Sequence, residues 1–208
     1  MEQDCLLAAA LVSDKHEEKR MADDNTVSRS LHDLGLAAWF GGSLMGAIGV
    51  NGAAAQVEEP KQRLRVANAG WTRWTPVNLA GIASHLAGGT VLLAANKGRV
   101  AGQQGVAQAT AVKTGLTVLA LGATAWARVL GAKLNQAGEV PVEGGTDPSG
   151  DTPEDVAKAQ QQLKFLQWGI PILTGAILVL NACMGEQQRP TQVSQGLFRR
   201  LLPGAKAA

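Results

Sequence analysis

The chain has 208 residues and a formal net charge of +2, and it is 46% hydrophobic but only 4% aromatic, with 25 glycines and no tyrosine. The weak charge, without a basic stripe interleaved with aromatic residues, argues against nucleic acid as a partner. The near-zero mean hydropathy of +0.02 hides a block pattern, because the apolar residues are gathered into uncharged runs. Many small and few aromatic residues suit helix contacts in lipid better than a water-soluble core.

We predict that residues 1–30 form a disordered N-terminal tail. The apolar stretch "CLLAAALV" at 5–12 is too short to span a membrane, and acidic residues precede it where a signal peptide has a cationic region. Met21 follows "EEKR", which resembles a ribosome-binding site read as protein. We therefore hypothesise that the native chain starts at Met21 and that residues 1–20 are not native.

Four apolar segments then follow, and an uncharged run of about 20 residues is enough to cross a hydrocarbon core of about 30 Å. They predict helices near 34–55, 75–97, 105–133 and 153–185. The connections are too short or too polar to cross the membrane, so the helices should alternate in direction, with no β-sheet. The predicted fold class is all-α: a polytopic membrane protein whose four-helix transmembrane bundle, up-down-up-down, covers residues 31–185. A flexible C-terminal tail is expected at 186–208.

The first span contains "GGSLMGAIGVNG" at 41–52, which raises the possibility of a phosphate-binding loop. Such loops follow a β-strand, whereas the preceding "LHDLGLAAWF" is helical in character. The glycines instead form a stripe of small residues, which lets a second helix approach closely in lipid. The expected helix-packing residues are Gly42, Gly46 and Gly49 on the first span, and Gly81, Ser84 and Gly88 on the second.

The third connection contains "DPSGDTPED", which suggests a calcium loop. An EF-hand needs Gly at its sixth position and Glu at its twelfth, where this chain has Thr152 and Lys158. The two cysteines, Cys5 and Cys183, are far apart and unlike in setting, so they form neither a metal site nor a disulfide framework. No metal site is predicted. Thr152 is expected to be the N-cap of the fourth helix, with Pro153 as its first residue.

His85 lies near the middle of the second span, where a polar side chain is costly and therefore suggests a function. A haem held by two histidines would need a second histidine at equal depth, but His32 stands at the start of the first span. We therefore predict no cofactor, and expect His85 to bond to a Ser, Thr or Asn of a neighbouring helix. No nucleophile with an adjacent base is visible, so no catalytic residue is predicted.

Alternating helix directions bring several polar residues to the same membrane face. This candidate polar cluster consists of His32, Asp33, Lys113 and Asn181. Charges at that depth tend to pair, so Asp33 is expected to meet Lys113 or shared polar neighbours. Two interpretations stay open: the cluster closes one end of the bundle, or it forms a polar mouth for an ion, a proton or a small polar ligand.

Three stretches, "LHDLGLAAWFGGSLMGAIGVNGAA", the segment that begins "GIASHLAGGTVLLAANKGRV", and "VPVEGGTDPSGDTPEDVAKAQQQLKFLQWGIPILTGA", together resemble a group of four-span bacterial membrane proteins of unassigned function. The resemblance covers about residues 30 to 190 and implies a bacterial inner-membrane location but no activity. In architecture alone, the chain is also similar to the DoxX-like four-helix membrane proteins, which are associated with redox systems.

Two functional hypotheses follow. The leading one is a non-enzymatic accessory or interaction protein of the bacterial inner membrane, which contacts the lipid bilayer and either a partner membrane complex or a second copy of itself. The alternative is a small carrier or redox-linked protein with a polar ligand or proton site between helices. Lys and Arg are more numerous in the flanks on the side of the termini, which predicts that both termini are cytoplasmic.

Overall fold

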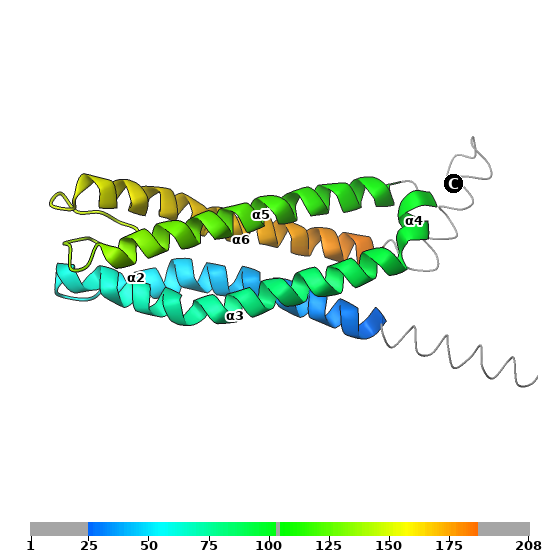
Figure 1. Cartoon of the computed structure of the whole chain (residues 1–208), viewed down its shortest axis with the longest axis horizontal. Helices are drawn as coiled ribbons and strands as arrows, with labels where there is room; N and C mark the ends of the chain where they lie inside the picture. Colours follow the sequence, from blue (N-terminus) through cyan, green and yellow to red (C-terminus); the bar gives the residue numbers. More distant parts are fainter. Residues whose placement is uncertain (1–24, 103–104, 187–208) are drawn as a thin grey trace, which may run out of the picture.

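The computed structural model describes residues 25–102 and 105–186. The expectations for a native start at Met21 and for tails at 1–24 and 187–208 lie outside these residues and stay predictions. Residues 25–30, predicted as part of the disordered N-terminal tail, are helical. Figure 1 shows the described part as long helices that lie side by side and are joined by short connections.

Four long helices form the bundle, and each runs opposite to the one before it (Figure 1). They are Asn25–Ala55, α3 at Pro60–Ala95, α5 at Val106–Gln136 and α6 at Glu154–Glu186, with the short α4 at Lys97–Gly102 between α3 and α5. All four are long and apolar enough to cross a membrane. The chain is therefore an all-α, multi-pass membrane protein, which confirms the predicted fold class. Within the described residues there is no β-strand, only an isolated bridge between Val142 and Pro148.

The first two helices begin earlier than predicted. The first is already helical at Asn25, and α3 begins at Pro60, where the side chain of Glu59 accepts a hydrogen bond from the Lys61 amide at 3.3 Å. Uncharged runs locate the part of a helix that crosses the apolar core, but not the charged turns that extend it into the interface. His32 therefore lies inside the first helix, not at its start.

Gly42 and Gly46 of the glycine stripe face α3. They lie against tryptophan rings of α3, however, and not against its backbone. A Cβ atom added to Gly42 would overlap the ring of Trp74, and one added to Gly46 would overlap the ring of Trp71. A Cβ atom added to Gly49 would meet only Met45 of the same helix within 4 Å. Since α3 begins at its charged turns, both tryptophans lie well inside it, and the two glycines make room for their rings. The prediction placed the stripe against Gly81, Ser84 and Gly88 of α3. The observed register of the two helices is shifted, so that Gly42 and Gly46 lie against Trp74 and Trp71.

The apolar core is divided along the bundle axis. A middle core takes residues from all four long helices: Leu36, Trp39, Ile82, Ala120, Ile170 and Ile177. A second core lies nearer one end, between α3, α5, α6 and the connection before α6: Leu64, Leu130, Leu134, Val142, Val156, Ala159 and Leu163. The two cores are separate clusters of buried residues, and the partly buried Ala127 of α5 packs against both.

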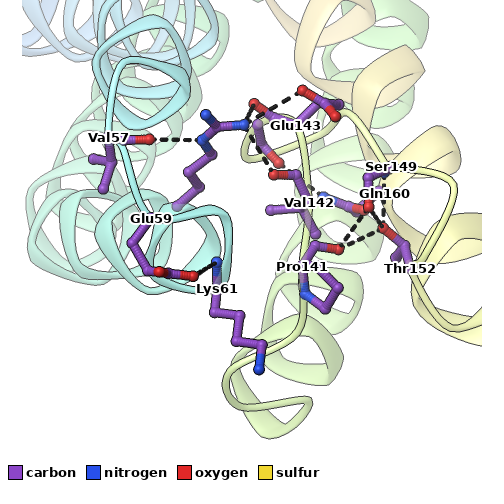
Figure 2. Close-up of polar contacts among 11 residues, drawn as sticks. Val57, Glu59, Lys61, Pro141, Val142, Glu143, Ser149, Thr152 and Gln160 are labelled. Atoms are coloured by element: carbon purple, nitrogen blue, oxygen red, sulfur yellow. Dashed lines mark hydrogen bonds and ion pairs between the residues drawn. The ribbon is translucent and has the colours of Figure 1, made fainter.

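We call the end nearer the second core the closed end. It is made by the turn 56–59 and the loop 137–153. Arg63 at the start of α3 bonds to both connections. Figure 2 labels the acceptors of these bonds, Val57 and Val142. The Nε of Arg63 donates to the carbonyl oxygen of Val57 at 2.7 Å, and its guanidinium also donates to the carbonyl oxygen of Val142 at 3.3 Å. Because irregular backbone leaves carbonyl groups without partners, an arginine with five donors suits this position.

The loop is also fastened from within and from α6 (Figure 2). The hydroxyls of Ser149 and Thr152 both donate to the carbonyl oxygen of Pro141, at 3.1 and 2.6 Å. Gln160, which is fully buried, donates to the carbonyl oxygen of Gly144 at 2.9 Å. The hydroxyl of Thr152 also accepts a hydrogen bond from the amide of Ser149. Because this hydroxyl bonds within the loop, Thr152 does not serve as the predicted N-cap of α6.

Candidate functional site

The opposite end, where the first helix begins, α6 ends and α4 joins α3 to α5, we call the open end (Figure 1). A cavity of about 760 Å³ lies there, with a mostly apolar wall to which all four long helices contribute. Its polar side chains include Arg29, His32, Asp33, His85, Lys113 and Asn181. The structure thus brings the whole candidate polar cluster and His85 to one cavity.

Two histidines from different helices form the centre of the site. The rings of His32 and His85 are stacked, with centroids 4.0 Å apart and planes 16° from parallel. Each ring bonds to the other residue's backbone: Nδ1 of His32 to the carbonyl oxygen of His85 at 2.8 Å, and Nδ1 of His85 to that of His32 at 2.9 Å. Because a carbonyl oxygen only accepts, both Nδ1 atoms carry the hydrogen, which leaves each Nε2 of a neutral ring as an acceptor.

The two backbones can approach this closely because glycines flank both histidines. A Cβ atom on Gly35 would lie 2.6 Å from the amide nitrogen of His85, and one on Gly88 would lie 2.7 Å from the amide nitrogen of His32. Neither position has room for a side chain. The first helix and α3 therefore cross at a contact that only glycine permits.

The same spacing of residues occurs on both helices. In "SRSLHDLG" (28–35) and "GIASHLAG" (81–88), a small residue is followed by histidine four positions later and by glycine three positions after that. On antiparallel helices, equal spacing produces the reciprocal contacts observed. The sequence prediction missed Ser28 and Gly35 because it followed the longer glycine stripe; the shared spacing is the signal that would have found them.

The predicted depths of the two histidines are wrong. A first span that begins at residue 34 places His32 at the membrane edge, far from the level of His85. With the helix already formed at Asn25, the two rings stack instead. The polar partner of His85 is accordingly the backbone of His32, and not the Ser, Thr or Asn side chain expected.

Lys113 of α5 adds a cationic group to the histidine pair. Its Nζ lies 2.8 Å from Nε2 of His32, which is the free acceptor of that ring. Asp33 has a different neighbour: its Oδ1 accepts a hydrogen bond from Asn181 of α6 at 3.3 Å. Among the described residues, Asp33 and Lys113 form no ion pair with each other. Lys113 instead contacts His32, and Asp33 contacts Asn181.

Polar side chains also connect the helices outside the cavity. Asn51 donates to Oε1 of Gln167 at 2.5 Å and accepts from Nε1 of Trp71 at 3.0 Å. In the middle of the bundle, Nε1 of Trp39 donates to the hydroxyl of Thr124 at 3.1 Å. These contacts pair donors with acceptors between neighbouring helices, which is the usual role of polar residues inside a membrane bundle.

No protein-family model matches the chain, and no curated protein or solved structure matches it either. What the site does must therefore follow from its residues and geometry.

Proposed function

We propose that the chain is a non-enzymatic protein of the bacterial inner membrane that binds a small amphipathic ligand between its helices at the open end. The observation that carries the proposal is the cavity of about 760 Å³. Its wall is mostly apolar but also contains the hydrogen-bonded pair of Lys113 and His32. Ligand pockets typically measure roughly 300–1,000 Å³ and combine an apolar lining with a few placed polar groups. A molecule with an apolar body and a polar head matches both parts of this wall.

The wall of the cavity also supports entry from the bilayer. Leu34 and Val118 line the cavity, yet 70% and 61% of their surfaces are uncovered. Uncovered apolar side chains on membrane-spanning helices contact acyl chains. A lipid-like ligand could therefore reach the polar groups without crossing an aqueous phase.

The proposal takes up the second of the two functional hypotheses, a carrier with a polar site between helices. An accessory role, through a partner membrane complex or a second copy of the chain, stays a prediction and is compatible with such a site. With both termini in the cytoplasm, as the Lys and Arg balance predicts, the open end faces the cytoplasmic leaflet.

A cavity-filling substitution tests the proposal. Ala182 lines the cavity, whereas Cys183 beside it does not, and both are exposed. Full-length chain purified in mild detergent is examined by native mass spectrometry, and bound amphiphiles are identified after denaturation. We expect wild type and Cys183→Trp to retain an amphiphile that Ala182→Trp has lost. Absence of any retained molecule from wild type, or equal retention by the two variants, would overturn the proposal.

A further inference from the structure

We infer that the polar end of the ligand is an anion, a carboxylate or phosphate group carried on an acyl chain, and that Lys113 is its counter-charge. The inference rests on the proposed function and names the chemical class of its ligand.

The charge of Lys113 is not balanced by its contact. Among the described residues, its hydrogen-bond partner is Nε2 of His32, a neutral acceptor that takes one of the three hydrogens of an ammonium group. A charge within a membrane span is costly and is normally paired. Asp33, the acidic residue of the wall described above, accepts from Asn181 and makes no ion pair with Lys113, so its carboxylate acts on the ammonium group only from a distance. A bound anion would supply a counter-charge in direct contact and accept the remaining hydrogens.

His32 fixes the position of that ammonium group. Its own Nδ1 is committed to the carbonyl oxygen of His85, and its ring is stacked on the ring of His85, so the direction of Nε2 is set by two contacts. A long lysine side chain is thereby held at one point of the wall. Charge-assisted hydrogen bonds from such a fixed donor are about twice as strong as neutral ones.

The rest of the wall suits an acyl chain. Leu121 of α5 and Leu178 of α6 line the cavity, as do Leu34 and Val118, whose surfaces are largely uncovered. A chain bound along these side chains would keep its head at Lys113 and its tail at the level of the lipid. A free fatty acid and an acidic phospholipid share this chemistry, so the experiment separates them.

The test compares pairs of probes that have matched acyl chains but head groups of different net charge. The full-length chain is placed in nanodiscs of zwitterionic phosphatidylcholine, and retention of oleate is compared with that of oleyl alcohol; a second arm compares phosphatidylglycerol with phosphatidylcholine. We expect one anionic probe to be retained at least about tenfold better than its uncharged or zwitterionic match, a preference of about 1.4 kcal/mol. Preference for oleate identifies a fatty acid, and preference for phosphatidylglycerol identifies a phospholipid.

Substitutions assign the preference to one residue. Lys113→Gln should abolish it, Lys113→Arg should keep it, and Lys97→Gln should leave it unchanged, because Lys97 is an exposed lysine of α4 at the same end that does not line the cavity. The wild-type comparison decides the matter even if Lys113→Gln does not fold. Equal retention of charged and neutral probes, both lost in Ala182→Trp, would overturn the anionic class and leave the proposed function standing. Retention of no probe by wild type would overturn the proposed function itself.

Discussion

The closed and open ends of the bundle use polar side chains in different ways. At the closed end, Arg63 and Gln160 donate to backbone carbonyl groups of the connections. At the open end, the polar side chains of His32 and Lys113 contact each other across two helices and line a cavity. The closed-end side chains thus bond to the backbone of the connections, whereas at the open end the histidines bond to helix backbone through Nδ1 and the Nε2 of His32 contacts a charged group in a cavity.

The connections themselves explain the contrast. The loop 137–153 at the closed end is almost wholly irregular, so its carbonyl groups need donors from side chains. At the open end, α4 makes most of the connection between α3 and α5 helical, and a helix pairs much of its own backbone. Polar side chains there are not needed to satisfy a loop. At the closed end, Arg63 and Gln160 are therefore engaged by the backbone of the connections.

The largest expected effect comes from the glycine crossing at the open end. In Gly88→Ala, the new methyl group would overlap the carbonyl oxygen of Ser28 and lie 2.7 Å from the amide nitrogen of His32. The two backbones would have to separate, and we expect the free energy of unfolding to fall by about 3 kcal/mol, the upper part of the range for overpacking. Unfolding in mixed detergent micelles, followed by circular dichroism, measures it.

Gly115 provides the matched control, because a Cβ atom there would meet nothing within 4 Å. Gly115→Ala should leave stability unchanged or raise it by up to about 1 kcal/mol, the helix propensity difference. Equal losses in the two variants would mean that the crossing is not held by close backbone contact. The control also separates helix propensity from packing.

The fold could be predicted from the sequence because the thickness of a bilayer dictates the length of an uncharged run. The first residue of α3 could not be predicted in this way, because the turns around Lys61 and Arg63 are charged and therefore resemble a loop when only uncharged runs are counted as helix. Most polar residues of the site were also identifiable from the sequence, but Arg29, which lines the cavity as well, was not among them. The contacts of these residues were not identifiable, because the stacking of His32 on His85 depends on a helix register that small residues set.

A smaller effect is expected from Arg63 at the closed end. Arg63→Gln removes the donors to Val57 and Val142, and since its side chain is only 17% exposed, we expect a loss of about 1–2 kcal/mol. Limited proteolysis should cut the loop 137–153 faster. Arg65→Gln is the control, because Arg65 pairs with Glu139 at an exposed site, where such pairs contribute about 0–1 kcal/mol. Comparable cleavage rates in the two variants would contradict the role given to Arg63.

The smallest expected effect is the coupling between the two ends. Arg63 and Gly88 both belong to α3, but they are roughly 37 Å apart along its axis at about 1.5 Å per residue. Their neighbours also differ: Arg63 contacts the two connections, whereas Gly88 contacts the first helix near His32. Substitutions this far apart without shared partners usually add within about 0.5 kcal/mol.

We therefore expect the double variant, Arg63→Gln with Gly88→Ala, to lose the sum of the two single losses to within about 0.5 kcal/mol. The same unfolding measurement on the four proteins of the cycle gives the coupling directly. A coupling above about 1 kcal/mol would show that α3 transmits strain between the ends, since well-separated sites do not reach that value. Additive losses would mean that the contacts of Arg63 at the closed end and the crossing at Gly88 at the open end stabilise the bundle independently of each other.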